Sequence, residues 1–183
     1  MADDLLEWLC SINTSIKNEY LYKNGYLFIT KPGLTKINSI LQNKNSEACS
    51  KLKIGNHTGM SLYNKKDILV NHVLCSGLPI GYHKEDEINV NNIPQKFIHD
   101  PIEYDLWEPL SKLFLDTYYI NTLLIAYENN IRNKSPSAPC YLTYIGGGYF
   151  EMNKFLIDNA RKNAVNFIRE KGLNLNVIIV NKP

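Results

Sequence analysis

Two glycine-containing segments hold the residues of this sequence that are best suited to binding chemistry. Residues 146–153 (GGGYFEMN) lie between an expected strand and an expected helix. Three consecutive glycines let the backbone adopt positive φ and direct several N–H groups toward one point. Because the N-terminus of the following helix adds partial positive charge, phosphate is the ligand that this pattern favours. A tight strand-to-helix turn explains the same glycines equally well.

The second segment, residues 75–82 (CSGLPIGY), follows another expected strand. Ligands of open α/β sheets bind beyond the carboxyl ends of the strands, so we expect the two segments to border one pocket. Neither segment has the spacing of a phosphate-binding loop of the kinase type or of a dinucleotide fingerprint. This argues against a P-loop kinase and against a nicotinamide-dependent dehydrogenase.

Two residues are candidates for catalysis. His57 lies between Gly55 and Gly59 in a polar segment, which suits either an exposed general base or a surface histidine in a turn. Cys75 follows a strand, where nearby N–H groups could lower the pKa of its thiol. A buried, inert cysteine is the alternative, and a Cys–His hydrolase would pair Cys75 with His57 or His83.

Polar and aromatic residues near the two segments are candidates for ligand contacts. Asn71 lies near the end of an expected strand and could orient a ribose hydroxyl. Tyr149 and Phe150 either fill the core or form a stacking wall for a ribose or a base. We interpret His72, in the same expected strand as Asn71, as a hydrogen-bonded core histidine.

Hydrophobic periodicity and turn residues predict the elements that must position these groups. A helical arm is expected within residues 1–25, and residues 83–104 are expected to form a surface insertion. Asp105 is expected to cap the long helix that follows, and Gly172 to end the last helix. Strands are predicted at 26–30, 67–74, 141–145 and 175–180, and helices at 34–43, 106–130 and 154–171.

The second half of the chain alternates strands and helices, which predicts an α/β layer fold around a largely parallel sheet. Strands 67–74, 141–145 and 175–180 are expected to be central in that sheet, and the first and last of them to be buried. The helix at 106–130 is expected to cross over the sheet with Leu113, Phe114 and Leu124 buried.

Composition limits the class of protein. The 183 residues are 44% hydrophobic and 21% charged, with a formal net charge of +2. These values are typical of one globular domain, and so small a net charge does not indicate a nucleic-acid partner.

No apolar run is long enough to cross a membrane, and the first ten residues lack the basic start of a secretory signal. We therefore expect an intracellular protein, cytoplasmic or nuclear. The cysteines show no metal-ligand spacing, so neither a metal nor a cofactor is expected; they are Cys10, Cys49, Cys75 and Cys140.

Residues 141–162 (YLTYIGGGYFEMNKFLIDNARK) resemble the late strand, loop and helix of macro domains, and residues 67–71 (DILVN) resemble the macro-domain strand that leads into a loop through Asn. The resemblance implies one three-layer domain over residues 1–183 around a mixed, largely parallel central sheet. It also implies a pocket for ADP-ribose or a related nucleotide diphosphate. The ligand-binding residues it implies are Asn71, Cys75, Ser76, Gly77, Gly146, Gly147, Gly148, Tyr149 and Phe150.

Two functions follow. The first is a macro-like protein that binds ADP-ribose and, as an enzyme, would be an ADP-ribosyl hydrolase whose water is activated by the substrate phosphate or by His57. The second is a non-enzymatic interaction protein on a degenerate macro-like scaffold. Glu151 favours the second function, because it occupies the position of a family glycine and would repel a phosphate.

Overall fold

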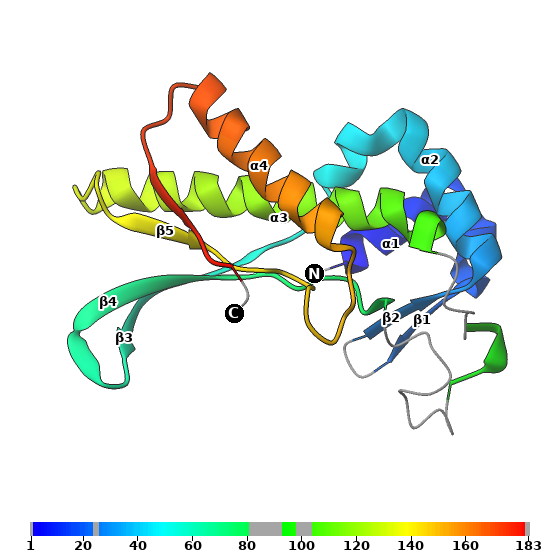
Figure 1. The fold of residues 1–183 in the computed structure, drawn as a ribbon. Coiled ribbons are helices and arrows are strands. Elements are labelled where there is room, and N and C mark those ends of the chain that lie inside the picture. Colours follow the sequence, from blue (N-terminus) through cyan, green and yellow to red (C-terminus); the bar gives the residue numbers. More distant parts are fainter. Residues whose placement is uncertain (1, 24–25, 81–92, 98–103, 182–183) are drawn as a thin grey trace.

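The computed structural model describes residues 2–23, 26–80, 93–97 and 104–181. Its longest element is helix α3 (Tyr104–Arg132), which runs the length of the molecule (Figure 1). One group of elements packs around the first half of α3, and a second group packs along its other half. Buried side chains of both groups join those of α3 in a continuous apolar core.

The helix α3 confirms the prediction of a long helix over residues 106–130. Leu113 and Phe114 are buried as expected, whereas Leu124 is only half-buried. The helix begins at Tyr104, so Asp105 lies in its first turn instead of capping it. A carboxylate in that turn still interacts favourably with the partial positive charge of the helix N-terminus.

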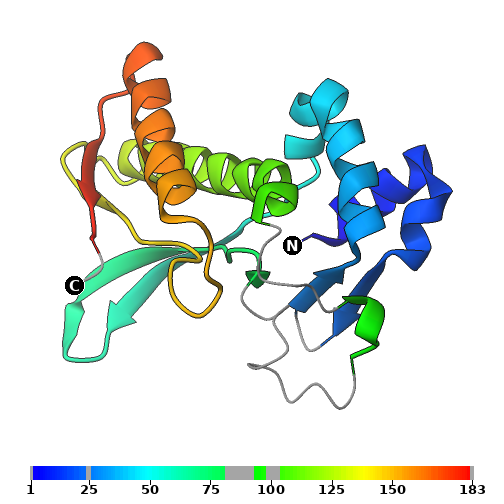
Figure 2. The ribbon, with the colours of Figure 1, turned by 45° about the vertical axis from the view of Figure 1, so that its right-hand side comes forward.

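The N-terminal group lies beside the first half of α3, which it contacts mainly through α2 (Figure 2). The expected helical arm is shorter than residues 1–25, because the chain leaves the helix at Ile12 and turns into a strand. The expected strand at 26–30 is confirmed. In chain order the elements are α1 (Asp3–Ile12), the 3-10 helix η1 (Thr14–Asn18), the antiparallel strands β1 (Tyr20–Lys23) and β2 (Tyr26–Ile29), and helix α2 (Lys31–Cys49).

Thr30 joins the strand β2 to helix α2. Its hydroxyl accepts a hydrogen bond from the Gly33 N–H at 3.1 Å and donates one to a carboxylate oxygen of Glu19 at 2.5 Å. The other oxygen of Glu19 pairs with the Lys36 ammonium at 2.8 Å. These two partners, Lys36 first, hold the pKa of Glu19 below its usual range. Helix α2 starts before the expected helix at 34–43 and runs past its expected end, with one non-helical residue at Lys44.

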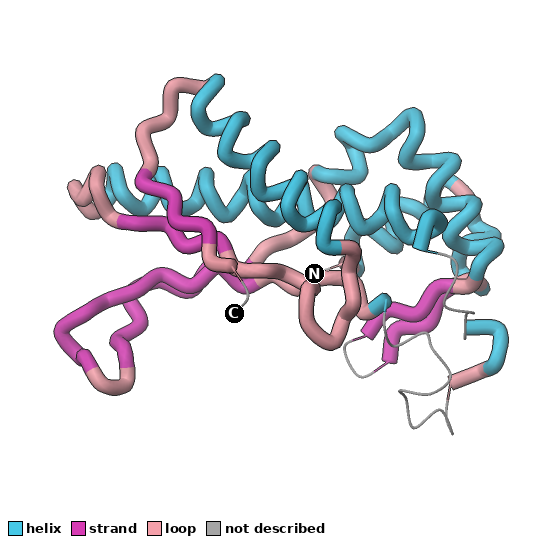
Figure 3. The backbone as a smooth tube through the Cα atoms, in the orientation of Figure 1, coloured by secondary structure: helices cyan, strands magenta, loops and turns pink. Residues whose placement is uncertain are grey.

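The three sheets each have two strands within the described residues, and this overturns the expected central sheet. Strands β1 and β2 are antiparallel, as are β3 (Gly55–Leu62) and β4 (Lys65–Leu74); only β5 (Pro139–Leu142) and β6 (Asn176–Ile179) are parallel. The three-layer, macro-like domain around a largely parallel sheet is therefore wrong. Figure 3 shows β3 and β4 as a hairpin that extends away from the helices.

The apolar run at 67–74 is not a central strand, because it pairs with the segment directly before it in the chain. A two-residue turn at Tyr63 and Asn64 folds β4 back on β3, so the run belongs to an exposed hairpin. Most of β4 is exposed, His72 included, which contradicts both the buried strand and the core histidine. The sequence does not predict strand β3, because residues 55–62 contain few of the β-branched residues that are typical of strands.

The second group of elements is a strand–helix–strand unit. Helix α4 (Lys154–Glu170) connects the parallel strands β5 and β6, and Gly172, with a φ of +65°, ends it as predicted. The buried Arg161 of α4 donates to the carbonyl oxygen of Val180 at 3.0 Å and pairs with Asp158. The last strand is largely exposed, so its predicted burial is wrong.

Thr30 provides a test of the junction between β2 and α2. Replacing Thr30 with Val keeps the shape of the side chain but leaves the Gly33 N–H and the Glu19 carboxylate without their partner. We expect the free energy of unfolding in urea to fall by about 1–3 kcal/mol. Thr30→Ser retains the hydroxyl and should lose less than half as much; equal losses for both variants would contradict the capping role.

Candidate functional site

The two glycine segments predicted to border a site meet each other in the structure. A Cβ atom added to Gly77 would lie 2.7 Å from the Cα atom of Gly146, and one added to Gly146 would lie 3.3 Å from the Cα atom of Gly77. The two backbones are therefore in direct contact at this point. No ligand fits between Gly77 and Gly146, so the expected pocket cannot lie there.

Packing explains three of the glycines. The sulfur of Met152 lies against both Gly77 and Gly146, where added Cβ atoms would approach it to 2.6 and 2.3 Å. A Cβ atom on Gly147 would overlap the ring of Tyr144, at 1.7 Å from its Cε1 atom. Positive φ occurs at Gly146 (+75°) and, in this loop, also at Glu151 (+51°). The tight-turn interpretation therefore accounts for Gly146 and Gly147, and packing accounts for Gly77.

Tyr119 of α3 fixes the start of this loop. Its hydroxyl donates a hydrogen bond to the carbonyl oxygen of Thr143 at 2.8 Å and accepts one from the Ile145 N–H at 3.1 Å. Burial raises the pKa of Tyr119 to about 12, so the phenol stays protonated and able to donate at neutral pH. On the other side of the loop, the Arg161 guanidinium lies 5.1 Å from the ring centre of Tyr144.

Gly148 differs from the other glycines of the loop. It is exposed, no atom lies within 4 Å of the position of an added Cβ, and its φ lies outside the left-handed region. Within the described part of the chain, the N–H groups of Gly148 and Tyr149 have no acceptor. They precede α4, whose first turn is capped by the Asn153 side chain accepting from the Phe155 N–H at 2.8 Å. The loop thus offers two backbone donors on exposed residues, five and four residues before the N-cap Asn153 of α4.

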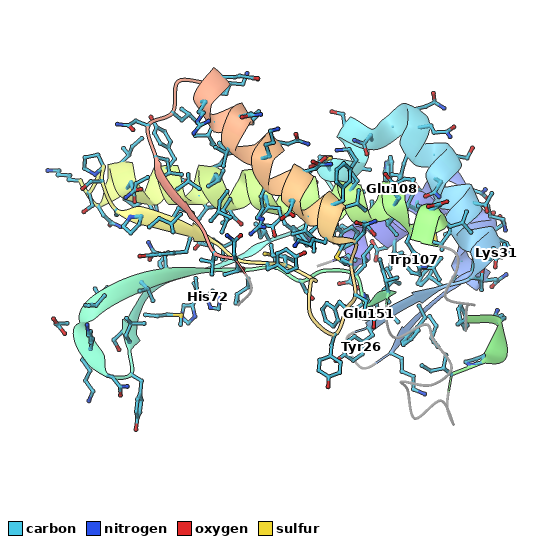
Figure 4. All side chains as sticks on the ribbon, viewed as in Figure 1. Tyr26, Lys31, His72, Trp107, Glu108 and Glu151 are labelled. Atoms are coloured by element: carbon cyan, nitrogen blue, oxygen red, sulfur yellow. The ribbon has the colours of Figure 1, made fainter. Side chains whose placement is uncertain are left out.

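Aromatic side chains flank these donors. Tyr149 is 80% exposed, and Phe150 packs edge-on against Tyr26 of β2 with ring centres 6.2 Å apart. Phe150 is therefore neither a core residue nor free, but part of an aromatic pair between the loop and the β1–β2 hairpin. Glu151 follows directly, half-buried, on the side of the loop near Tyr26 (Figure 4). Its N–H donates to the Gly148 carbonyl oxygen at 3.0 Å.

Cys75 and Ser76 lead into the contact at Gly77. Burial raises the pKa of the Cys75 thiol to about 11, and a hydrogen bond with Thr122 only partly opposes this effect. The thiol is therefore protonated at neutral pH and is a poor nucleophile. The Ser76 hydroxyl donates to the carbonyl oxygen of Gly77 at 3.2 Å and so is already engaged with its own loop.

His57 and Asn71 are not brought to the loop. Both belong to the β3–β4 hairpin, where His57 is paired with His72, and Figure 4 shows His72 well apart from Glu151. The Asn71 side-chain oxygen accepts from the Gly59 N–H at 3.0 Å, which supports a bend in β3 instead of a ribose. The other possible partner of Cys75, His83, lies outside the described residues.

The residues that shape the loop, Tyr119, Tyr144, Met152 and Arg161, carry no signal in the sequence. Tyr119 lies next to residues that follow the helical apolar pattern, and the carbonyl and N–H groups that it contacts are backbone atoms of a distant segment. Only the run of three glycines pointed to this place.

No protein-family model, curated protein or solved structure matches the chain. Among the described residues, none of the helices combines the length and the apolar character needed to span a membrane. The same residues contain no group of three or more His, Cys, Asp or Glu side chains arranged to hold a metal ion.

The bridging role of Tyr119 can be tested by removing its hydroxyl. Tyr119→Phe leaves the Ile145 N–H without an acceptor, and we expect the free energy of unfolding to fall by about 1–3 kcal/mol. Tyr118→Phe is the matched control, because Tyr118 is equally buried and its hydroxyl makes no hydrogen bond with the described residues. Chemical denaturation of both variants measures the difference, and a similar loss in the two would contradict the bridge.

The glycine contact predicts a second difference. Gly77→Ala places a methyl group against the Gly146 backbone and should lower the free energy of unfolding by about 1–3 kcal/mol, as overpacking does. Gly148→Ala places it in open space and should change stability by less than about 0.5 kcal/mol, as exposed surface substitutions do. Thermal denaturation measures both; a destabilised Gly148 variant would show that packing constrains this glycine too.

Proposed function

We propose that the loop at residues 146–153 binds the phosphate groups of a nucleotide diphosphate of the ADP-ribose type. The observation that carries the proposal is Gly148, an exposed glycine that neither packing nor a positive φ requires, with unpaired N–H groups at Gly148 and Tyr149. A residue without a side chain at this point lets an anion approach the backbone closely.

The physical basis of phosphate binding here is a pair of charge-assisted hydrogen bonds. Each hydrogen bond from an N–H group to a charged oxygen contributes about 1.5–3 kcal/mol. The N-terminus of α4 directly follows the loop and adds partial positive charge, whose effect is greatest within the first turn. Tyr119 and the contact between Gly77 and Gly146 fix the loop beforehand, so little ordering is required of it when a ligand binds.

The aromatic pair supports the nucleoside part of the proposal. Phe150 and Tyr26 meet edge-on beside the loop, and Tyr149 exposes most of its ring next to the two donors. An aromatic face of this kind can stack on a nucleobase, with a contribution of about 1–3 kcal/mol per base in proteins that use it. The adenine would therefore occupy the Tyr149 or Phe150 side of the loop.

Glu151 opposes binding. Two like charges about 4 Å apart repel each other by about 1 kcal/mol in water, and by more where water is partly excluded. The half-buried residue Glu151 follows Tyr149 by two residues and Gly148 by three. We therefore expect modest affinity, and we expect it to increase when this charge is removed.

The proposed function is ligand binding, and we assign no catalytic base to the loop at residues 146–153. His57 lies on the β3–β4 hairpin, and the Cys75 thiol is protonated because burial raises its pKa. Hydrolysis of an ADP-ribosyl linkage at this loop would thus depend on the substrate's own phosphate to activate water. The alternative of a non-enzymatic interaction protein is favoured by the exposed apolar side chains of the hairpin, Tyr63 at 95% and Leu69 at 68% exposure.

Calorimetric titration with ADP-ribose tests the proposal. We expect the wild-type protein to give saturable heat, Gly148→Val to weaken binding about tenfold or more by losing one charge-assisted hydrogen bond, and Glu151→Gln to strengthen it about fivefold. Adenosine and inorganic phosphate, titrated separately, distinguish recognition of the base from recognition of the phosphate.

The control for this titration is stability, because Gly148→Val must remain folded for its affinity to be interpreted. We expect this variant to fold, because the space around Gly148 is open. The absence of heat from the wild-type protein at millimolar ADP-ribose would overturn the proposal. So would unchanged affinity in both variants, which would place the ligand elsewhere on the chain.

A further inference from the structure

The β3–β4 hairpin carries a pair of histidines that the proposed function does not use. His57 of β3 lies directly opposite His72 of β4 in the antiparallel register. Both side chains are exposed, and neither makes a hydrogen bond or an ion pair with the described residues. The hairpin extends away from the helices (Figure 3), so solvent reaches both imidazoles.

Directly opposed residues of an antiparallel pair have their side chains on the same face of the sheet, with Cβ atoms about 4.5–5.5 Å apart. Two imidazoles at this spacing can turn one nitrogen each toward a common point. Metal ions bind histidine nitrogens at about 2.0–2.1 Å, so a single ion between the two rings satisfies both. The antiparallel register sets this spacing whenever the hairpin is paired.

A bulge in β3 adds a third group to this face. Between the pairs His57↔His72 and Met60↔Val70, β3 advances by three residues while β4 advances by two, so β3 contains one extra residue. Val70 and His72 share a face because they are two residues apart on the same strand. Met60, opposite Val70, therefore returns to the face of the two histidines, which it would not do without the bulge.

Asn71 and Gly59 hold the bulge in place. Gly59 adopts a φ of +70°, which favours glycine, and its N–H donates to the Asn71 side-chain oxygen at 3.0 Å. Asn71 thus acts from the opposite face of β4 to fix the position of Met60 relative to His72. This face then presents two exposed imidazoles and one half-buried thioether, the ligands that copper prefers.

We propose that His57 and His72 form a binding site for a transition-metal ion of the copper or nickel class, with Met60 as a weaker third ligand for the reduced, softer Cu⁺. The remaining coordination positions are open to water. Such a site is exchangeable and not structural, because the hairpin forms through its own backbone pairing. The proposal is independent of nucleotide binding, since the hairpin face and the loop at 146–153 share no residue.

The test uses the full, untagged chain titrated with Cu²⁺ and, separately, with Ni²⁺. We expect one high-affinity site, and for Cu²⁺ an electron paramagnetic resonance spectrum with hyperfine splitting from two imidazole nitrogens. His57→Gln and His72→Gln should each weaken binding of both ions by at least about tenfold, because even the loss of an outer-shell partner of a ligand typically weakens metal binding about 10–100-fold.

A matched control keeps the number of histidines constant. The double variant His57→Gln/Asn56→His moves the imidazole by one residue and thereby to the opposite face of β3. It should bind as weakly as His57→Gln alone. Affinity in either single variant equal to that of the wild type, or full recovery in the double variant, would overturn the site, because the ion would then be bound elsewhere, for example by the cysteines.

Met60→Leu tests the thioether. This substitution keeps the size and apolar character of the side chain but removes the sulfur. It should weaken binding of Cu⁺, measured by competition with a chromogenic chelator, and leave binding of Ni²⁺ unchanged. Unchanged Cu⁺ affinity would contradict the role of Met60 as a ligand.

Discussion

The backbones of Gly77 and Gly146 are in direct contact, and this contact joins two distant parts of the structure. It brings the chain leaving the β3–β4 hairpin against the chain leaving β5, and Met152 covers both glycines. Tyr119 holds the same loop from α3 through two backbone groups, so the loop is fixed on both sides. A side chain at either glycine would clash with the other segment or with Met152 and force the two segments apart.

The helices could be predicted because their signals are local. Apolar residues recur at helical spacing in α3 and α4, and Gly172 takes the left-handed conformation that ends a helix. The sheet could not be predicted, because an apolar run such as residues 67–74 does not specify its partner. The run is compatible with a central parallel strand and with a hairpin, and only the short turn at Tyr63 and Asn64 decides for the hairpin.

The candidate site illustrates a similar limit. The run of three glycines lies in the loop of the proposed site, but Gly146 and Gly147 are explained by contacts with Met152 and Tyr144 that no local pattern reveals. Only Gly148 has no packing contact and no positive φ that would require a glycine. His57 and Asn71 are candidates because of their residue types and their places in the expected elements, and the bulged register of the hairpin gives both of them a different environment from the one expected.

The hairpin also differs from the rest of the molecule in how its backbone is protected. Most side chains of β3 and β4 are exposed, and the ladder between them is built from residues that are neighbours in the chain. Its amide hydrogens can therefore exchange with solvent through local opening, whereas those in the buried middle of α3 exchange only when the core unfolds. Short-range pairing of this kind forms in about 1–10 microseconds, so the hairpin can open and close many times during the lifetime of the folded core.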